Sequence, residues 1–599
     1  MPKPGRQRQK PARLPLLIPA ALVLAVALAT YFNGLTAPFV WDDDSAIVTN
    51  ESIRESPGGA LVPPLETPVA GRPVVNATLA VNYALGGLDT TGYHVWNLAV
   101  LAASALLLFG IVRRTLYRRR APASLAEAER RREGGRYVDG VALVAALTWM
   151  VHPLLSETVD YVTQRSESMM GLFFLLTLYA AIRARHARRS LTWEVVSIVS
   201  CALGMATKES MVTAPLAVVL YDCVFEFDSL RNAVTSRRFL YAGLAATWLE
   251  LGVIMWRWPR STVGGTAVGP WTYLLNQAQM IARYLGLTVW PQSLVLDYGL
   301  PRMLALRDVV VEGALVVSLA AATAFALRRW PAIGFLGVMF FLTLAPTSSI
   351  VPITSEVGAE RRMYLPLAAL VVLVVTVAGG FVERVRLRSP GRSRAVLGAA
   401  MAVSAVLIGA LALRTVYRNR EYATPIAVWE SVIARRPQGR ARFALANELI
   451  AAGREADAIA QLREAVVDFP DARAGLGTEL LLGGQFQEAV DVLEAFVEAN
   501  PSAPNRAPAR PLIATGYREL AQQWLRQQQP AKAADQARRS IQYVPNNADA
   551  HNLLGAALAS QGQIEQAVEE FQAALRIDPQ HQQARNNLAR ASAFLQQRR

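Results

Sequence analysis

Long apolar runs, separated by short polar or basic loops, fill the chain from residue 14 to about residue 413. Runs of this length and composition predict helices that cross a membrane, tilted where they are short. About eleven spans are predicted, at about residues 14–33, 93–112, 138–152, 166–182, 194–209, 211–226, 239–257, 308–327, 332–346, 364–382 and 395–413. Beyond about Arg414 the pattern changes to helical periodicity among Ala, Gln, Glu and Arg, which predicts water-soluble helices. We therefore expect an all-α protein in which a polytopic transmembrane helix bundle precedes a soluble helical domain.

One further apolar stretch, Trp271 to Trp290, could be counted as a span. It carries Arg283, which would be costly at the middle of a bilayer, and tryptophans and tyrosines that suit the headgroup layer. Counting it would also place Arg361 and Arg362 among the cytoplasmic loops. We predict an interfacial helix over residues 271–291, and a crossing helix is the alternative.

The soluble part contains an internal repeat with the spacing of tetratricopeptide repeats. Small and apolar residues fall at identical offsets before a proline in the first and last copies: Leu445, Ala446, Leu449, Ala458, Leu462, Ala465 and Pro470, then Leu554, Gly555, Leu558, Ala567, Phe571, Ala574 and Pro579. Two further copies end at Pro501 and Pro545, and the Pro-rich stretch from Pro501 to Pro511 is predicted to be a loop. About four repeats over residues 439–582 predict an α-solenoid.

These patterns predict five parts of the chain. They are a basic cytoplasmic tail over 1–13, a transmembrane domain over 14–413, a linker and capping helix over 414–438, the repeats over 439–582 and a C-terminal capping segment over 583–599. The helix with Trp429 is expected to cap the repeats on the membrane side. We expect the first apolar run to be an anchor, because it is long and lacks an Ala-x-Ala-like cleavage site.

The net charge of +15 is best explained by membrane topology. Most arginines fall in alternate loops, at 113–136, 183–189, 231–238, 328–329 and 384–394, and such loops lie in the cytoplasm. The N-terminus is then cytoplasmic, and an odd number of spans places the repeats on the opposite side. The Arg- and Ala-rich composition favours a bacterial inner membrane with periplasmic repeats. Membrane lipids are expected partners, and no nucleic-acid partner is expected.

Several types of chemistry are excluded by what the sequence lacks. It has no Gly-rich phosphate loop, no G-x-S-x-G elbow and no H-E-x-x-H, which argues against nucleotide-driven transport and serine hydrolysis. Cys201 and Cys223 both lie in apolar runs and are expected to be packing residues. No metal and no cofactor are predicted, because no ligand set recurs at a recognisable spacing.

Ionisable and polar groups gather on the predicted outer face, near the ends of spans, where unpaired charges are costly. They are Asp42, Asp43, Asp44, Arg72, His94, His152, Glu157, Arg165, Glu167, Lys208, Glu209, Arg283, Glu360, Arg361 and Arg362. Each alone has a plain explanation, such as an arginine reaching the interface, or Asp43 or Asp44 capping a short helix through Ile47. Their common side indicates one site. Its cations could hold a phosphate, and its carboxylates could take a proton from a hydroxyl.

Six segments carry a resemblance to a known family: FVWDDDSAIVTN (39–50), RPVVNATLAVNYALGGLDTTGYHVWNL (72–98), HPLLSETVDYVTQRSESMMGLFFL (152–175), TKES (207–210), ARYLGLTVWP (282–291) and GAERRMYLPLA (358–368). They resemble the GT-C-type transmembrane and tetratricopeptide-repeat O-mannosyltransferases. The resemblance implies inverting transfer of mannose or a related hexose from a polyprenyl-phosphate-linked donor to an acceptor hydroxyl. The expected acceptor is Ser or Thr of a protein on the extracytoplasmic face.

The resemblance also suggests residue roles. Asp42 or Asp43 is the candidate general base, and Lys208, Arg361 and Arg362 are candidates to hold the donor phosphate. Glu209 and Glu360 would orient these cations. If residues 157–165 are helical, Glu157 and Arg165 share a face. Together with Arg72, His94, Asn97 and His152, they are expected to shape the sugar pocket.

Two other functions fit the same sequence. The chain could be a non-enzymatic, membrane-anchored tetratricopeptide scaffold for envelope complexes. It could also transfer a sugar to a lipid or a surface glycan, with the repeats recruiting assembly partners. The repeats are expected to bind a polypeptide acceptor or a partner protein, and a rigid spacer is the plain alternative.

Overall fold

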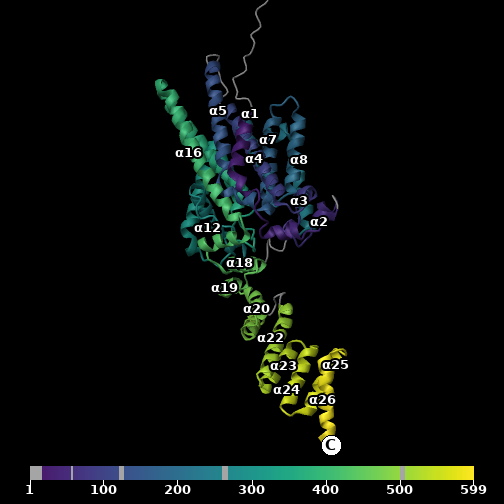
Figure 1. Ribbon diagram of the computed structural model, residues 1–599. Helices are drawn as coiled ribbons and strands as arrows, with labels where there is room; N and C mark the ends of the chain where they lie inside the picture. The colour runs from purple at the N-terminus through teal and green to yellow at the C-terminus, as the bar shows by residue number, and fades with distance from the viewer. Residues whose placement is uncertain (1–16, 56–57, 120–126, 260–267, 500–505, 599) are drawn as a thin grey trace, which may run out of the picture. The chain divides into compact units, whose positions relative to one another are not determined.

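The computed structural model describes residues 17–55, 58–119, 127–259, 268–499 and 506–598, so the predicted basic tail lies outside the described residues. The chain is built from helices and divides into two compact units, Met1–Arg435 and Arg436–Arg599 (Figure 1). The predicted all-α fold is confirmed.

The first unit contains the apolar helices. Within the described residues, seven helical stretches are long and apolar enough to cross a membrane: Leu17–Gly34, Thr90–Arg118, Val162–Ala184, Arg238–Arg257, Leu306–Arg329, Glu360–Arg388 and Ser393–Tyr422. Their main helices are α1 (Leu17–Tyr31), α4 (Thr90–Arg119), α7 (Arg165–Ala184), α11 (Arg238–Arg257), α13 (Val310–Arg329), α15 (Tyr364–Arg388) and α16 (Ser393–Asn419).

The remaining predicted spans are also helical but are bent or short. Tyr137–Met150 with Pro153–Asp160, and Glu209–Glu226 with Leu230–Ser236, are pairs bent by 56° and 110°, and counting each as one span raises the number to nine. The other two predicted spans coincide with the shorter helices α8 (Ser190–Met205) and α14 (Pro331–Leu344). All eleven apolar runs therefore form helices, although not all are long enough to cross a bilayer alone.

The predicted interfacial helix is α12 (Pro270–Val289). One face, with Tyr273 and Tyr284, is buried in the unit, whereas Trp271 and Val289 are exposed at its ends. This two-sided character fits a helix that lies along an apolar boundary, and its place at the membrane interface remains a prediction.

The first predicted outer loop packs as a small helical subdomain on the beginnings of α4 and α7. It contains the helical turn Asp44–Val48, α2 (Ser52–Glu55) and α3 (Pro73–Gly86). A buried cluster joins it to the spans: Ala46, Ile47, Ile53, Val69, Val75, Leu79, Tyr93 and Val162. This apolar contact fixes the Asp42–Asp44 segment against the chain that precedes α7.

That preceding chain is buried but does not form one helix. Pro153–Leu155 is a 3₁₀ turn after α5 (Glu127–Met150), α6 spans Glu157–Asp160, and a second 3₁₀ turn over Val162–Gln164 leads into α7. Tyr161 between them is extended, with φ −99° and ψ 104°. The premise that Glu157 and Arg165 share a helical face is therefore wrong, because the chain changes direction at Tyr161.

The second unit confirms the predicted repeats. Its helices are α18 (Gly439–Ala451), α19 (Glu455–Ala465), α20 (Ala472–Leu482), α21 (Phe486–Ala499), α22 (Arg506–Arg526), α23 (Pro530–Tyr543), α24 (Ala548–Ser560), α25 (Ile564–Ile577) and α26 (Gln582–Arg598). Successive helices pack in antiparallel pairs, and the repeat positions are buried between them. At Gly555 a Cβ atom would lie 2.7 Å from the ring of Phe571, so this position needs glycine for close helix packing.

Two expectations about the ends of the repeats need correction. The Pro-rich stretch is not a loop throughout, because α22 begins at Arg506 and contains Pro511; residues 500–505 lie outside the described residues. The helix with Trp429, α17 (Pro425–Arg435), groups with the first unit, where the rings of Trp429 and Trp41 lie 4.6 Å apart. The compact units therefore divide at Arg435, inside the segment 414–438 that the sequence predicts as linker and capping helix.

Candidate functional site

Asp43 is an anchor of the first outer loop. Its side chain is fully buried, and Oδ1 accepts hydrogen bonds from the backbone N–H (2.7 Å) and hydroxyl (2.5 Å) of Thr163. Oδ2 accepts from the backbone N–H groups of Val40 (3.0 Å) and Val162 (3.3 Å). Burial raises the pKa of Asp43 to about 7, against the lowering effect of these donors. Asp43 therefore ties the loop to residues 162–163, and does not cap the helical turn after it.

Asp42 is placed differently from its neighbours. Its side chain is half-buried, next to the phenol of Tyr161, whose oxygen accepts a hydrogen bond from the Asp42 backbone N–H at 3.1 Å. Burial raises the pKa of Asp42, while Tyr161, Arg361 and Arg72 partly offset this rise. Asp44 is exposed. Within the acidic triplet, Asp42 is the carboxylate that is partly accessible and also close to the cations of the site.

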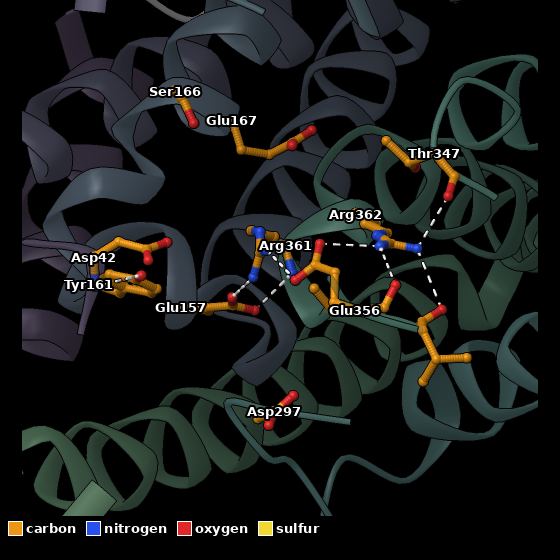
Figure 2. A network of polar contacts seen from close by, with 12 residues as sticks. Asp42, Glu157, Tyr161, Ser166, Glu167, Asp297, Thr347, Glu356, Arg361 and Arg362 are labelled. Atoms are coloured by element: carbon orange, nitrogen blue, oxygen red, sulfur yellow. Dashed lines mark hydrogen bonds and ion pairs between the residues drawn. The ribbon is translucent and has the colours of Figure 1, made fainter. Parts of the chain in front are cut away.

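Arg361 lies between two carboxylates (Figure 2). Its Nη1 is 2.5 Å from Oε1 of Glu157, its backbone N–H donates to Oε2 of the same residue at 2.9 Å, and its Nη2 is 2.5 Å from Oε2 of Glu356. Glu157 is fully buried, whereas 22% of the Glu356 side chain and 13% of the Arg361 side chain are exposed. The guanidinium plane is thus fixed by charge-assisted hydrogen bonds on two sides.

Arg362 points away from Arg361 and clamps the loop before it. Its guanidinium donates to Tyr273 Oη (3.2 Å), to the carbonyl of Thr347 (3.0 Å) and to Oε1 of Glu356 (3.0 Å). Only 1% of its side chain is exposed. Burial alone would raise the pKa of Glu356, but Arg361 and Arg362 outweigh this effect and bring it to about 2. Glu356 therefore joins both arginines, and Arg362 has its donors directed into the protein.

Lys208 and Arg72 both contact the first turn of α7. Nζ of Lys208 is 2.6 Å from Oε2 of Glu167, and both side chains are almost fully buried. Burial lowers the pKa of Lys208, and Glu167 partly restores it. Nη1 of Arg72, which is half-buried, donates to the hydroxyl of Ser166 at 3.2 Å. Lys208 is close enough to Arg72 and Arg361 for their charges to affect its titration, so these three cations belong to one cluster.

Buried polar side chains hold the beginnings of α4 and α7 in place. Nε2 and Nδ1 of His94 lie 2.9 Å and 3.2 Å from the carbonyl oxygens of Ala37 and Val159. Asn97 donates to the Val159 carbonyl at 3.3 Å and accepts from Nε of Arg165 at 2.8 Å. His94 and Asn97 share a face of α4, since both lie against the Val159 carbonyl. The side chains of His94, Asn97 and Arg165 are fully buried and bonded to protein atoms, so they position parts of the site and do not line it.

His152 and Glu360 are likewise bonded to other parts of the protein. Nδ1 of His152 accepts from the Leu154 N–H at 3.2 Å, and Nε2 lies 3.1 Å from the Thr288 carbonyl. Oε1 of Glu360 accepts from the Val295 N–H at 2.5 Å, and Oε2 is 3.7 Å from Arg418. The expectation that Glu360 orients Arg361 is therefore wrong.

The expected role of Glu209 is shared with a second carboxylate. Glu167 forms the ion pair with Lys208, and the half-buried Glu209 also lies close enough for its charge to raise the pKa of Lys208. Glu209 follows directly after an extended Lys208, with φ −159° and ψ 142°, so adjacent side chains point in different directions.

Exposure divides these residues of the candidate site into two sets. The half-buried members, which a substrate could touch, are Asp42, Arg72, Glu209, Glu356 and Arg361, with Lys208 just beneath them. The fully buried members, bonded within the protein, are Asp43, His94, Asn97, His152, Glu157, Arg165, Glu360 and Arg362. Among the described residues no group of three or more His, Cys, Asp and Glu side chains is placed to hold a metal.

Sequence reasoning missed Glu356 and Tyr161. Glu356 stands four residues before the Glu360–Arg361–Arg362 triplet in a polar loop, and an acid close to two arginines was an available signal. Tyr161 had none, because its role depends on the break between α6 and α7.

Comparison with known proteins gives this geometry a context. Residues 135–256 match the family described as dolichyl-phosphate-mannose-protein mannosyltransferase. Residues 443–504, 518–582 and 561–599 match tetratricopeptide repeats. The chain is 24% identical over 520 residues to protein O-mannosyl-transferase TMTC4 of Mus musculus, covering 76% of this chain and 67% of that one. It is 24% identical over 542 residues to protein O-mannosyl-transferase Tmtc1 of Drosophila melanogaster, covering 73% and 60%.

The chain is a homologue of the GT-C-type O-mannosyltransferases with tetratricopeptide repeats. Its membrane unit is similar to glycosyltransferases that depend on polyprenyl-phosphate sugars, which confirms the resemblance predicted from the sequence. This chain covers between 21% and 67% of the length of these relatives.

Solved structures are similar to this homologue at low sequence identity. ArnT from Cupriavidus metallidurans bound to undecaprenyl phosphate is 18% identical, with a TM-score of 0.34, over 82% of this chain and 80% of that one. YrrB, a tetratricopeptide-repeat protein with an unusual peptide-binding site, is 22% identical, with a TM-score of 0.22, over 27% of this chain and 80% of that one.

Proposed function

We propose that this chain moves mannose or a related hexose from a polyprenyl-phosphate-linked donor to Ser or Thr of a polypeptide, on the extracytoplasmic face of a membrane. The observation that carries the proposal is the convergence of a half-buried carboxylate, Asp42, with three cations, Arg72, Lys208 and Arg361. A carboxylate for the acceptor and cations for a phosphate leaving group are the two requirements of this reaction.

Asp42 acts as the general base. It takes the proton from the acceptor hydroxyl as the oxygen attacks the anomeric carbon, and the bond between that carbon and the phosphate oxygen breaks with inversion. Burial raises the pKa of Asp42, and a higher pKa makes its carboxylate a stronger base. Asp43 has no part in this step, because both of its oxygens are already bonded to the protein.

The leaving polyprenyl phosphate carries the negative charge that develops in the reaction. Arg361 is held in place by Glu157 and Glu356, and a guanidinium has five N–H donors, so donors remain for a phosphate oxygen. Arg72 and Lys208 add positive charge on the same side. Arg362 is left out of this role, because its guanidinium is buried against the loop that it clamps.

The orientation rests on the opposite ends of the spans. Three loops that the arginine pattern places in the cytoplasm meet through ion pairs whose carboxylates are buried: Arg113 with Asp139 (2.6 Å), Arg118 and Arg185 with Glu226, and Arg237 with Asp222 (2.6 Å). His94 and Arg165 lie at the other ends of α4 and α7. This supports a cytoplasmic N-terminus and an extracytoplasmic site. The repeats would present the polypeptide acceptor, as stacked helix pairs commonly do.

The test uses the purified full chain in proteoliposomes with polyprenyl-phosphate hexoses labelled in the sugar. The proposal predicts release of polyprenyl phosphate and label on serine or threonine of added polypeptides, with one hexose preferred. Label that appears only on lipid or glycan would overturn the polypeptide acceptor. No transfer from any polyprenyl-phosphate hexose would overturn the enzymatic proposal.

A further inference from the structure

Two arginines at the basic ends of α4 and α7 converge on one phenol. Nη2 of Arg114 donates to the Tyr179 hydroxyl oxygen at 3.3 Å, and Nη1 of Arg183 donates to the same oxygen at 3.1 Å. The Arg114 guanidinium carbon is 5.2 Å from the centre of the Tyr179 ring, and that of Arg183 is 4.1 Å from the Trp193 ring. The helices α4 and α7 pack against each other, and the bond from Arg114 on α4 to Tyr179 on α7 joins them (Figure 1).

The position of Tyr179 depends on a close approach to α4. A Cβ atom at Gly110 would lie 2.7 Å from the Tyr179 ring, one helical turn before Arg114. Glycine at 110 therefore lets the phenol lie against α4 and reach both guanidiniums. The arrangement is a built one in which an aromatic side chain holds two cations at a fixed separation.

Neighbouring arginines at this end have carboxylate partners, and within the described residues this pair has none. Arg113 pairs with Asp139 and Arg237 with Asp222, each at 2.6 Å, and Arg118 pairs with Glu226. Within the described part of the chain, the hydrogen-bond acceptor shared by Arg114 and Arg183 is a neutral hydroxyl. One neutral oxygen cannot balance two positive charges that lie so close together, and such cations repel unless an anion joins them.

We propose that Arg114 and Arg183 form a binding site for the phosphate group of an anionic membrane lipid. Both side chains are half-buried, and both retain N–H donors beyond those given to Tyr179. They stand near the ends of apolar helices beside Trp193, a residue type that favours the headgroup layer. Basic pockets between membrane helices are recognised binding places for anionic headgroups, and guanidiniums bind phosphate bidentately.

The bound phosphate would join α4 and α7 at their basic ends. The opposite ends of these helices carry His94, Asn97 and Arg165, which hold each other and the loops behind the candidate active site. A lipid at Arg114 and Arg183 would therefore stabilise the helix pair on which that site is built. Inorganic phosphate offers the same oxygens without acyl chains, so the two sources are separated by experiment.

The test measures the melting temperature of the delipidated full chain in neutral detergent, titrated separately with phosphatidylglycerol, phosphatidylcholine and inorganic phosphate. The proposal predicts that phosphatidylglycerol alone raises it at micromolar to millimolar concentrations. In the double variant Arg114→Gln/Arg183→Gln, the concentration for half the effect should rise at least about tenfold, because charge-assisted bonds are lost. The matched control, Arg188→Gln/Arg189→Gln, removes the same formal charge from exposed positions at this end and should respond like the wild type.

An unchanged response of the double variant would overturn the proposal, as would an equal response of the wild type to phosphatidylcholine. An equal response to inorganic phosphate would overturn the lipid as the source. If the double variant does not fold, native mass spectrometry of the wild type decides, since the proposal predicts at least one phosphatidylglycerol retained in preference to phosphatidylcholine. Arg183→Lys, which keeps the charge but loses the planar fork, should then bind that lipid more weakly than the wild type.

Discussion

Asparagine in place of Asp43 should loosen the first outer loop without removing any group from the reaction. The carboxylate accepts four hydrogen bonds, two at each oxygen, from Val40, Val162 and Thr163. An amide has only one accepting oxygen. If that oxygen faces Val40 and Val162, the amide nitrogen faces Thr163, whose hydroxyl can turn to accept but whose backbone N–H is left without an acceptor.

The free-energy cost of Asp43→Asn can be estimated from these hydrogen bonds. One buried N–H without an acceptor costs about 1–3 kcal/mol, and the remaining bonds lose their charge assistance, which adds about 1 kcal/mol. Burial raises the pKa of Asp43 to about 7, so the neutral amide regains part of this by avoiding a buried charge. A net loss of about 2–3 kcal/mol makes local opening of the loop about 30- to 150-fold more frequent.

Hydrogen exchange of the purified protein measures this opening directly. The backbone amides of Val40, Val162 and Thr163 should lose about 30- to 150-fold of their protection in Asp43→Asn, whereas Asp44→Asn, at an exposed neighbour, should leave it unchanged. Protection that stays within about threefold of the wild type in Asp43→Asn would refute the anchoring role.

Three further changes test other parts of the structure. The pKa of Glu356 is about 2 in the folded protein, against an ordinary 4.5, so its ion pairs should stabilise the wild type fully above about pH 4.5. About 3 kcal/mol of this stability should be lost as the pH falls towards 2. In Glu356→Gln this loss should be absent from acid melting curves, and curves of wild type and variant that run parallel would refute the prediction. Arg361→Lys cannot bond Glu157 and Glu356 through two separate nitrogens, so the KM for the donor should rise about tenfold with the acceptor KM unchanged; an unchanged donor KM would count against a phosphate role. Gly555→Ala should lower the stability of the repeat unit by about 1–3 kcal/mol in denaturant titration, since the new methyl meets Phe571; an unchanged midpoint would contradict the close packing.

The sequence was sufficient for the helices, the repeats and several members of the site, although it missed Glu356 and Tyr161. Apolar runs and repeat offsets depend on local periodicity, and the outer-face charges came together because they all follow or precede spans on one side. Asp42, Lys208 and Arg361 do converge, as their common side predicts. The free-energy cost of unpaired charges near the ends of spans was therefore an informative signal for the site.

Partner choice could not be predicted from the sequence. Glu360, Arg361 and Arg362 lie on a 3₁₀ turn, Glu360–Met363, where successive side chains point about 120° apart. Glu360 reaches Val295, Arg361 reaches Glu157, and Arg362 reaches the Thr347 carbonyl. Apart from Glu356, which pairs with both arginines, these adjacent charges have different partners, and none of the contacts can be predicted without the turn.

The roles of Asp42 and Asp43 were equally hidden. The two carboxylates are adjacent in the sequence and chemically identical, and only the segment around Tyr161 distinguishes them. Its backbone donors hold Asp43, and the phenol lies beside Asp42. Neither contact has a periodic signal, because the segment changes direction between α6 and α7.

The central claim is that Asp42 takes the proton from the acceptor hydroxyl. The most direct measurement is the rate of sugar transfer from a polyprenyl-phosphate hexose in proteoliposomes, for wild type, Asp42→Asn and Asp44→Asn. Loss of a general base should lower kcat by about 100-fold or more in Asp42→Asn, with hydrogen exchange of Val162 and Thr163 unchanged, and Asp44→Asn should match the wild type. Transfer by Asp42→Asn within about threefold of the wild-type rate would contradict the account.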